Sequence, residues 1–268
     1  MRYEEYAVMP EGLPLVLFED IVRTPSRHSA EQNWHDTVEL QLATEGEGCV
    51  LIDGERHPLR AGDIALIPSD AIHYTYSDTS LTYSCLIVGA EFCLRMGIDH
   101  RTLSFPPVVR SEALAALFSA VREAYHAEAP FRTARLSHSL LSLLLALLRE
   151  YAAEGEGRTV DGRALSGVKR ALLYLREHFA ERVTLDAVAR AALLDKYTLA
   201  KSFKKYTGET VVTYLTRYRC LCAGEYLAAG CSVGEAAELS GFGSLSFFTK
   251  IYKRYMGELP SKRKKEKR

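Results

Sequence analysis

The sequence predicts an α+β protein: an N-terminal antiparallel β-barrel of the jelly-roll type, a helical segment, and an all-α domain built from two similar units. Three observations support this prediction. Short runs rich in β-branched and aromatic residues, separated by turn signals, fill residues 1–105. Apolar residues at helical spacing replace them from residue 111 onward. Near the C-terminus, two stretches repeat one helix–turn–helix pattern.

The N-terminal strands are recognised by composition and by the turns between them. Asp53–Gly54 is a two-residue hairpin signal, because the favoured hairpin turn needs positive φ at both central positions. Many short strands joined by hairpins are typical of a small closed barrel. The predicted strands lie at 17–22, 38–46, 48–59, 63–69, 73–77 and 81–89.

The segment 106–154 has helical apolar spacing at 111–128 and at 132–154. The second of these helices is apolar around most of its circumference, so it must be buried on more than one side. We expect one side to lie on the barrel and the other to pack against the same helix of a second subunit, giving a homodimer. An intramolecular helical pair is the alternative. The residues assigned to the dimer contact are Leu136, Leu140, Leu143 and Leu147.

A polar, glycine-rich stretch at 155–163 is the predicted linker, and residues 164–268 form the predicted all-α domain. This domain contains helix–turn–helix units at 184–206 and 233–255, joined by a long helix at about 209–228. The second helix of each unit is apolar on its inner side and carries lysines on its outer side. Such a helix can bury one face and insert the other into a DNA groove.

Charge divides the chain in the same place. Residues 1–160 contain 13 Arg and no Lys against 23 Asp and Glu, whereas residues 161–268 contain 21 Lys and Arg against 11 Asp and Glu. A basic module joined to an acidic one is expected when a phosphate-binding domain is attached to a domain of another kind. Composition drift between two unrelated domains is the alternative.

The composition excludes several classes of protein. With 47% hydrophobic and 25% charged residues, the chain resembles ordinary globular proteins. Its N-terminus lacks a secretion signal, and its longest apolar run, near 140–148, is too short to span a membrane. The six cysteines lack the spacing of a zinc or disulfide framework. We therefore expect a cytoplasmic protein with reduced cysteines and no membrane partner.

Residues 233–260 carry a spaced pattern that includes Gly241–Phe242, Lys250 and Pro260, and residues 184–208 carry a looser copy of it. Through these residues the C-terminal part resembles the DNA-binding domain of the AraC/XylS family of bacterial transcription regulators. It departs from the family at Leu245, where Gln is common, and at Arg263–Lys264, where the family usually has Tyr-Arg. The resemblance implies sequence-specific binding to double-stranded DNA, dimerisation through the central helices, and RNA polymerase as a partner if the regulator is an activator.

Helix geometry and the family resemblance together assign the DNA contacts. Residues near the N-terminal end of each second helix reach base edges, and basic residues further along reach phosphates. The base-reading candidates are Tyr197, Ala200 and Lys201 in the first unit and Leu245, Ser246, Thr249 and Lys250 in the second. The phosphate candidates are Lys196, Lys204, Lys205, Lys253 and Arg254.

Part of the barrel resembles the two sequence motifs of cupins, through residues 34–39, 62–63, Pro68 and His73. In metal-bearing cupins three His and one Glu surround a metal. His35, Glu39 and His73 match three of these positions, and Asn33 replaces the remaining His. Because His35 and Glu39 are four residues apart, we expect them on one face of one strand.

Three roles are open for these polar residues: a weakly supported metal site of His35, Glu39 and His73, a pocket for a small effector, or hydrogen-bonded barrel residues without a ligand. The pocket would use His35, Glu39, Gln41, His73 and Tyr83. Because Asn33 replaces a ligand, we expect no cofactor and no catalytic activity. The family resemblance mildly favours a sugar as effector.

The function predicted from the sequence is a dimeric transcription regulator that responds to a small molecule. Two alternatives belong to other classes. One is a metal-dependent cupin enzyme with a DNA-binding appendage. The other is a dimeric DNA-binding protein whose barrel binds no effector.

Overall fold

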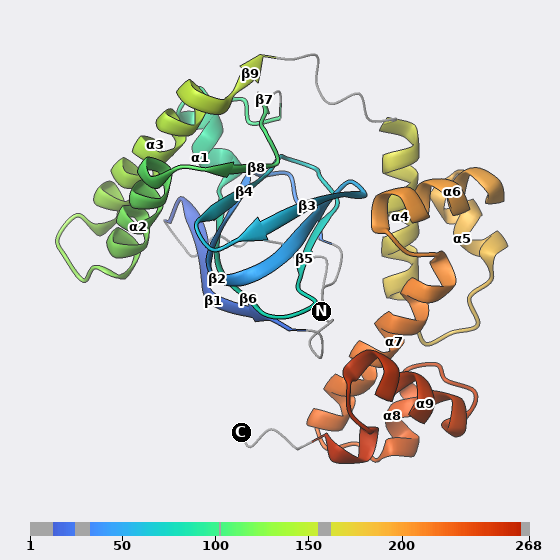
Figure 1. Cartoon of the computed structure of the whole chain (residues 1–268). Helices are drawn as coiled ribbons and strands as arrows, with labels where there is room; N and C mark the ends of the chain where they lie inside the picture. The colour runs from blue at the N-terminus through green and yellow to red at the C-terminus, as the bar shows by residue number, and fades with distance from the viewer. Residues whose placement is uncertain (1–12, 25–32, 102, 155–161, 264–268) are drawn as a thin grey trace. The chain divides into compact units, whose positions relative to one another are not determined.

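The computed structural model describes residues 13–24, 33–101, 103–154 and 162–263 (Figure 1). The chain divides into two compact units. The sheet unit contains the described residues up to 154, and the helical unit contains residues 162–263. Most of the predicted linker, residues 155–161, lies outside the described residues. An antiparallel sheet domain followed by a helical domain confirms the predicted α+β class.

The six predicted strands fall on β1–β6, with 38–46 and the start of 48–59 forming β2 and the rest of 48–59 forming most of β3, and every strand pairing among the described residues is antiparallel. The larger sheet has the order β1-β6-β2-β4-β8, and β3 and β5 pair with β2. The strands are β1 (Leu15–Arg23), β2 (Glu39–Ile52), β3 (Glu55–Arg60), β4 (Asp63–Ile67), β5 (His73–Tyr76), β6 (Leu81–Val88), β7 (Leu103–Ser104), β8 (Val108–Arg110) and β9 (Ala153–Glu154). The short elements β7, β8 and β9 and the helix α1 (Ala90–Arg95) were not predicted.

The strand β2 is one continuous element of 14 residues where the sequence predicted two. Its first half pairs with β4 and β6, and its second half pairs with β3 and β5. The register shifts between Ala43 and Glu45, and Gly46 has φ +74°, with Ser80 O only 2.1 Å from the position a Cβ would take. The bulge and the glycine therefore bend β2, so that one strand serves both layers of the sheet unit.

Alternate residues of β2 face two different apolar clusters. Val38, just before the strand, and Leu40 belong to the cluster between the sheet and helices α2 (Glu112–His126) and α3 (Arg132–Tyr151). Ala43 belongs to the cluster on the other face, which also contains Tyr83 and Cys85 of β6. Glu39 and Gln41 alternate with the residues of the first cluster, so they point to the second face.

Helices α2 and α3 lie side by side and cover one face of the sheet (Figure 1). Leu136, Leu140, Leu143 and Leu147 are only 0–1% exposed and belong to the cluster between α3, α2 and the sheet. The prediction that these four leucines form the dimer contact is therefore wrong. Periodicity identified a buried stripe, but the sheet of the same chain covers it. On the opposite side of α3, Leu145 is 55% exposed.

The helical unit contains a helix that the sequence analysis did not predict, α4 (Gly162–Glu177), whose buried stripe packs on α5 and α6. The remaining helices follow the predicted pattern. They are α5 (Leu185–Ala192), α6 (Lys196–Thr207), α7 (Val211–Ala228), α8 (Val233–Leu239), α9 (Leu245–Met256) and a short 3-10 helix at Pro260–Lys262. Among the described helices, none is both long and apolar enough to cross a membrane.

The pairs α5–α6 and α8–α9 repeat one design. A hydroxyl side chain caps the first helix of each pair, Thr184 in one and Ser232 in the other. A residue with positive φ follows that helix, Leu193 at 56° directly after α5 and Gly241 at 74° two positions after α8. Three residues separate α5 from α6, whereas five separate α8 from α9. The two turns therefore have the same handedness although their sequences differ.

Close contact around α7 holds the two copies together. Arg219 of α7 donates hydrogen bonds to the carbonyl oxygens of Phe179 and Glu181, both at 2.7 Å, in the loop that precedes the first copy. A Cβ at Gly241, in the turn of the second copy, would lie 2.6 Å from the carbonyl oxygen of Ala180 in the same loop. The second turn therefore lies against the loop that leads into the first copy.

This contact predicts different tolerance at the two equivalent turn positions. Gly241→Ala should destabilise the helical unit by about 2 kcal/mol or more, because the new methyl group meets backbone at a residue with positive φ. Leu193→Gly should change stability by less than about 1 kcal/mol, because relief of left-handed strain offsets the added freedom of the unfolded chain. The measurement is the urea dependence of thiol labelling at Cys220 and Cys222, which are buried in α7. Equal effects of the two substitutions would contradict the close approach.

Candidate functional site

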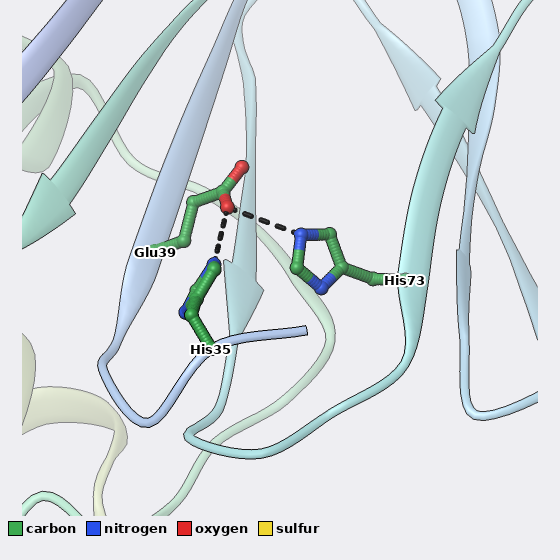
Figure 2. A group of neighbouring side chains, drawn as sticks. All are labelled: His35, Glu39 and His73. Carbon is green, nitrogen blue, oxygen red and sulfur yellow. Dashed lines mark hydrogen bonds and ion pairs between the residues drawn. The ribbon is translucent and has the colours of Figure 1, made fainter. Parts of the chain in front are cut away.

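A buried polar cluster lies at the start of β2. It contains His35, Glu39 and His73, all at most 5% exposed. Figure 2 shows both imidazole rings directed at the same carboxylate oxygen of Glu39. His35 was expected on the same strand as Glu39. That expectation is wrong, because β2 begins at Glu39 and His35 lies before it. The preceding segment instead brings the ring of His35 to the carboxylate.

The distances within the cluster are those of hydrogen bonds. Nε2 of His35 lies 2.8 Å and Nε2 of His73 lies 3.1 Å from Oε2 of Glu39. The two rings meet edge to face, with centroids 5.1 Å apart. Backbone pairing between Asn33 and His73, with N–O distances of 2.9 Å in both directions, joins the segment before β2 to β5. The cluster is therefore held by two segments distant in sequence.

The other ring nitrogens constrain where the protons lie. Nδ1 of His73 is 3.0 Å from the carbonyl oxygen of Ala71, which can only accept. Nδ1 therefore carries a proton, and Nε2 needs a second proton to donate to Glu39. Nδ1 of His35 is 3.1 Å from both the carbonyl and the hydroxyl oxygen of Thr37. Because Nε2 of His35 must donate to the ionised Glu39, the neutral ring carries its proton on Nε2 and accepts from the Thr37 hydroxyl at Nδ1. A charged His73 beside an ionised Glu39 accounts for these contacts with protons alone.

Glu39 is held in its charged form. Burial by itself would raise its pKa, but the positive charge of His73 and the hydrogen bonds from both rings outweigh burial and hold the pKa well below its ordinary value of 4.5. The other carboxylate oxygen, Oε1, accepts hydrogen bonds from Gln41 Nε2 at 2.6 Å and Cys85 Sγ at 3.0 Å. The network thus extends from the histidines to β6.

Gln41 extends the network further, because its Oε1 accepts a hydrogen bond from Thr75 at 2.5 Å. Four of the five predicted pocket residues are therefore joined by hydrogen bonds: His35, Glu39, Gln41 and His73. The fifth, Tyr83, is buried on the same face of the sheet, and burial raises its pKa. Its ring lies 5.6 Å from the guanidinium of Arg23.

Sequence reasoning missed two members of this network, Thr75 and Cys85. Both could have been found from strand alternation, since Thr75 is two residues after His73 on β5 and Cys85 is two residues after Tyr83 on β6. Thr75 is buried, and its side chain donates to Gln41 of another strand.

The three central side chains also match the donor set of a metal site. Their ligand atoms lie within 4.8 Å of one another, and among the described residues no other group of His, Cys, Asp and Glu does so. Two nitrogens and one oxygen suit zinc and leave a fourth position open. The hydrogen bond from His73 Nδ1 to a backbone carbonyl is the support that metal-bound histidines usually have. The trio therefore fits either shared protons or one cation.

The second candidate surface consists of the outer faces of α6 (Lys196–Thr207) and α9 (Leu245–Met256). In α6, Tyr197 is 77% exposed, and Ala200, Lys201, Lys204 and Lys205 are also exposed. In α9, Leu245, Ser246, Lys250, Lys253 and Arg254 are exposed, and Thr249 is half-buried. The opposite sides of these helices, including Leu199, Phe203, Phe248 and Tyr252, are fully buried. All but one of the predicted DNA-contact residues therefore lie exposed on the outer side of their helices.

Some of these side chains already have partners. Lys196 forms an ion pair with Asp186 at 3.0 Å, so a phosphate would have to compete with that carboxylate. The hydroxyl of Thr249 donates to the carbonyl oxygen of Leu245 at 2.9 Å, inside its own helix. Sequence reasoning missed Phe247, which is 52% exposed in the first turn of α9. The sequence offered one signal for Phe247 as a surface residue, which is its place next to Ser246 in the first turn of the helix.

The charge of Glu39 predicts a pH dependence of stability. Because the folded-state pKa is depressed, the carboxylate contributes stability that is present above about pH 4.5 and is lost as the pH falls toward the folded-state pKa. Glu39→Gln should lower stability by about 3 kcal/mol near neutral pH, since it leaves His73 without its counter-charge. The difference from wild type should shrink as the pH falls below about 4.5.

Thermal denaturation between about pH 7 and pH 3 measures this difference. Glu45→Gln is the matched control, because Glu45 is exposed on the same strand. A difference between Glu39→Gln and wild type that does not change with pH would contradict the assigned charge state.

Comparison with known proteins matches each unit separately. The family model described as the AraC-like ligand binding domain matches residues 18–145, and a helix-turn-helix domain model matches residues 188–266. The chain is 23% identical over 240 residues to the Msm operon regulatory protein of Streptococcus mutans, covering 86% of this chain and 85% of that protein. It is 24% identical over 239 residues to the transcriptional activator RhaS of Salmonella schwarzengrund, covering 83% of each.

Among solved structures, ToxT from Vibrio cholerae aligns over 92% of this chain and 95% of its own, with a TM-score of 0.47 and 14% identity. The family models and the curated relatives carry the assignment. They confirm the resemblance found in the C-terminal sequence and extend it to the sheet unit. The chain therefore belongs to the AraC family of DNA-binding transcription regulators, with an AraC-like ligand-binding domain followed by a helix-turn-helix domain.

Proposed function

We propose that this regulator is a cytoplasmic, dimeric activator whose DNA binding is controlled by a polar small molecule, such as a sugar, bound in the sheet unit. The observation that carries the proposal is the buried chain of polar groups from Thr75 through Gln41 and Glu39 to the two histidines. Activation is supported by the name of the relative RhaS, a transcriptional activator. An activator would also contact RNA polymerase.

The polar chain suits a ligand rich in hydroxyl groups. Burying polar groups costs free energy unless each finds a hydrogen-bond partner. In the folded chain these polar groups are hydrogen-bonded to one another. They include both donors and acceptors, so a ligand can take the place of one of the partners. Each hydroxyl of a sugar is a donor and an acceptor, so it can replace a bond such as Thr75–Gln41 without leaving a buried group unpaired.

We propose that the cluster needs no metal and performs no catalysis. Protons alone satisfy the contacts of His73 and His35 with Glu39, which supports this proposal. If a metal were bound, His35, Glu39 and His73 would hold it, and it would supply a positively charged centre for a ligand oxygen. That alternative predicts tight binding of a divalent cation by the purified protein.

The effector proposal is tested by thermal shift of the full-length protein with a panel of sugars and other polyols, and of divalent cations alone. A ligand at 100 times its Kd should stabilise the protein by about 2.7 kcal/mol. Thr75→Val should weaken the response to that ligand about tenfold or more, since it removes a donor from the buried chain. Thr44→Val is the control, because Thr44 is exposed on β2.

By linkage, the same ligand must bind with a different affinity when operator DNA is present. Equal affinity with and without operator would contradict control of DNA binding. Stabilisation by a cation alone, abolished by His73→Gln, would favour the metal alternative.

A dimer contact is proposed on the side of α3 that faces away from the sheet. His138, Ser142 and Leu145 share that side, and the apolar Leu145 is unusually exposed there. Beside it, α2 and α3 form a surface groove of about 560 Å³ whose small lining residues include Ala120, Ala124 and Ala127. Small residues let a partner helix approach closely. The corresponding helices of a second copy are the proposed occupant.

Leu145→Glu should therefore weaken self-association at least tenfold, because it places a charge in the centre of the proposed contact. Sedimentation velocity over a range of protein concentrations measures the dissociation constant. Thr133→Glu is the control, since Thr133 is exposed on a different side of the same helix. A dimer of unchanged affinity in Leu145→Glu would place the contact elsewhere.

A further inference from the structure

The recognition helices α6 and α9 can be compared position by position. Both contain 12 residues, both begin after a side-chain cap, Asp195 and Ser244, and both end at a glycine with positive φ, Gly208 and Gly257. Residues at the same position in α6 and α9 therefore face the same way relative to the rest of their own helix-turn-helix copy. The equivalent pairs at the reading end are Lys196 and Leu245, Tyr197 and Ser246, Thr198 and Phe247, Ala200 and Thr249, and Lys201 and Lys250.

The first turns of the two helices differ in chemistry. In α6 the first residue is Lys196, which is charged and tied to Asp186. In α9 the first residue is Leu245, which is 53% exposed although it is apolar. Phe247, two residues later, is equally exposed at 52%, but its ring lies 6.3 Å from that of Phe242. Leu245 is the exposed apolar side chain at the first position of α9, the end of a recognition helix that reaches base edges.

The surroundings of Leu245 point to DNA as its partner. Lys250, Lys253 and Arg254 are exposed on the same helix, as expected for a surface that faces phosphates. In the major groove, the one apolar group that a base pair offers is the C5 methyl of thymine. A leucine side chain cannot donate or accept a hydrogen bond, so it can distinguish bases only through that methyl group.

Resting on the DNA-reading function proposed for α9, we propose that Leu245 makes the second helix-turn-helix copy selective for thymine through its methyl group. The first copy, with Lys196 and Lys201 at its reading end, has no apolar equivalent at this position. The two copies therefore prefer different base compositions, and thymine is required in the half of the site that α9 occupies.

The test replaces thymines with deoxyuridine, which removes the methyl group and keeps the base pairing unchanged. An operator is first selected from random DNA by the full-length protein, and each thymine is then replaced singly. We expect one or two replacements in the half-site of α9 to weaken wild-type binding about threefold to tenfold through loss of the contact with Leu245. Leu245→Ala should bind the unmodified operator more weakly and show no further loss at those positions.

Lys196→Ala is the matched control, because it truncates the equivalent residue of α6 and should keep the sensitivity to deoxyuridine. Indifference of the wild-type protein to every replacement would overturn the inference and leave DNA reading intact. Sensitivity that persists in Leu245→Ala would overturn it as well. Failure to recover any preferred sequence would overturn the DNA-reading function and this inference together.

Discussion

The close approach between Gly241 and Ala180, reinforced by Arg219, is the constraint on which DNA reading by this chain depends. It places the turn of the second helix-turn-helix copy against the loop that leads into the first. Two recognition helices that moved independently would each bind weakly, whereas a fixed pair binds as one unit. The helix α7 completes this arrangement, since it packs against helices of both copies. The side chains that face DNA can therefore vary while the spacing of the two helices stays constant.

The sheet unit holds a charged hydrogen-bond network in its interior. Glu39 has partners on both carboxylate oxygens, supplied by the segment before β2 and by β2, β5 and β6. A ligand that exchanged with one partner would disturb strands that are distant in sequence. The bent strand β2 carries Glu39 and Gln41 on one face and Leu40 on the other, toward α2 and α3. A shift of β2 caused by a change in the network would therefore also move Leu40 against α2 and α3, the helices proposed to join two subunits.

Much of this organisation could be predicted from the sequence, because strand alternation, helix spacing and turn residues are local signals. Three features could not. The spacing of Leu136 and Leu140 shows that this stripe is buried, but not whether the same chain or a second one covers it. His35 and Glu39 do meet, yet through a segment before the strand and not along it. Leu193 adopts a left-handed conformation without a glycine to signal it, because the repeated turn geometry determines that position.

We propose that one chain places its two recognition helices in successive major-groove segments. Hydroxyl-radical footprinting of the full-length protein on a selected operator tests it most directly. Two protected patches are expected for each subunit, on the same face of the duplex and about one helical turn, or 34 Å, apart. Substitution of Lys201 should weaken one patch and substitution of Lys250 the other. A single protected patch for each subunit, affected by only one of these substitutions, would contradict this placement of the two helices.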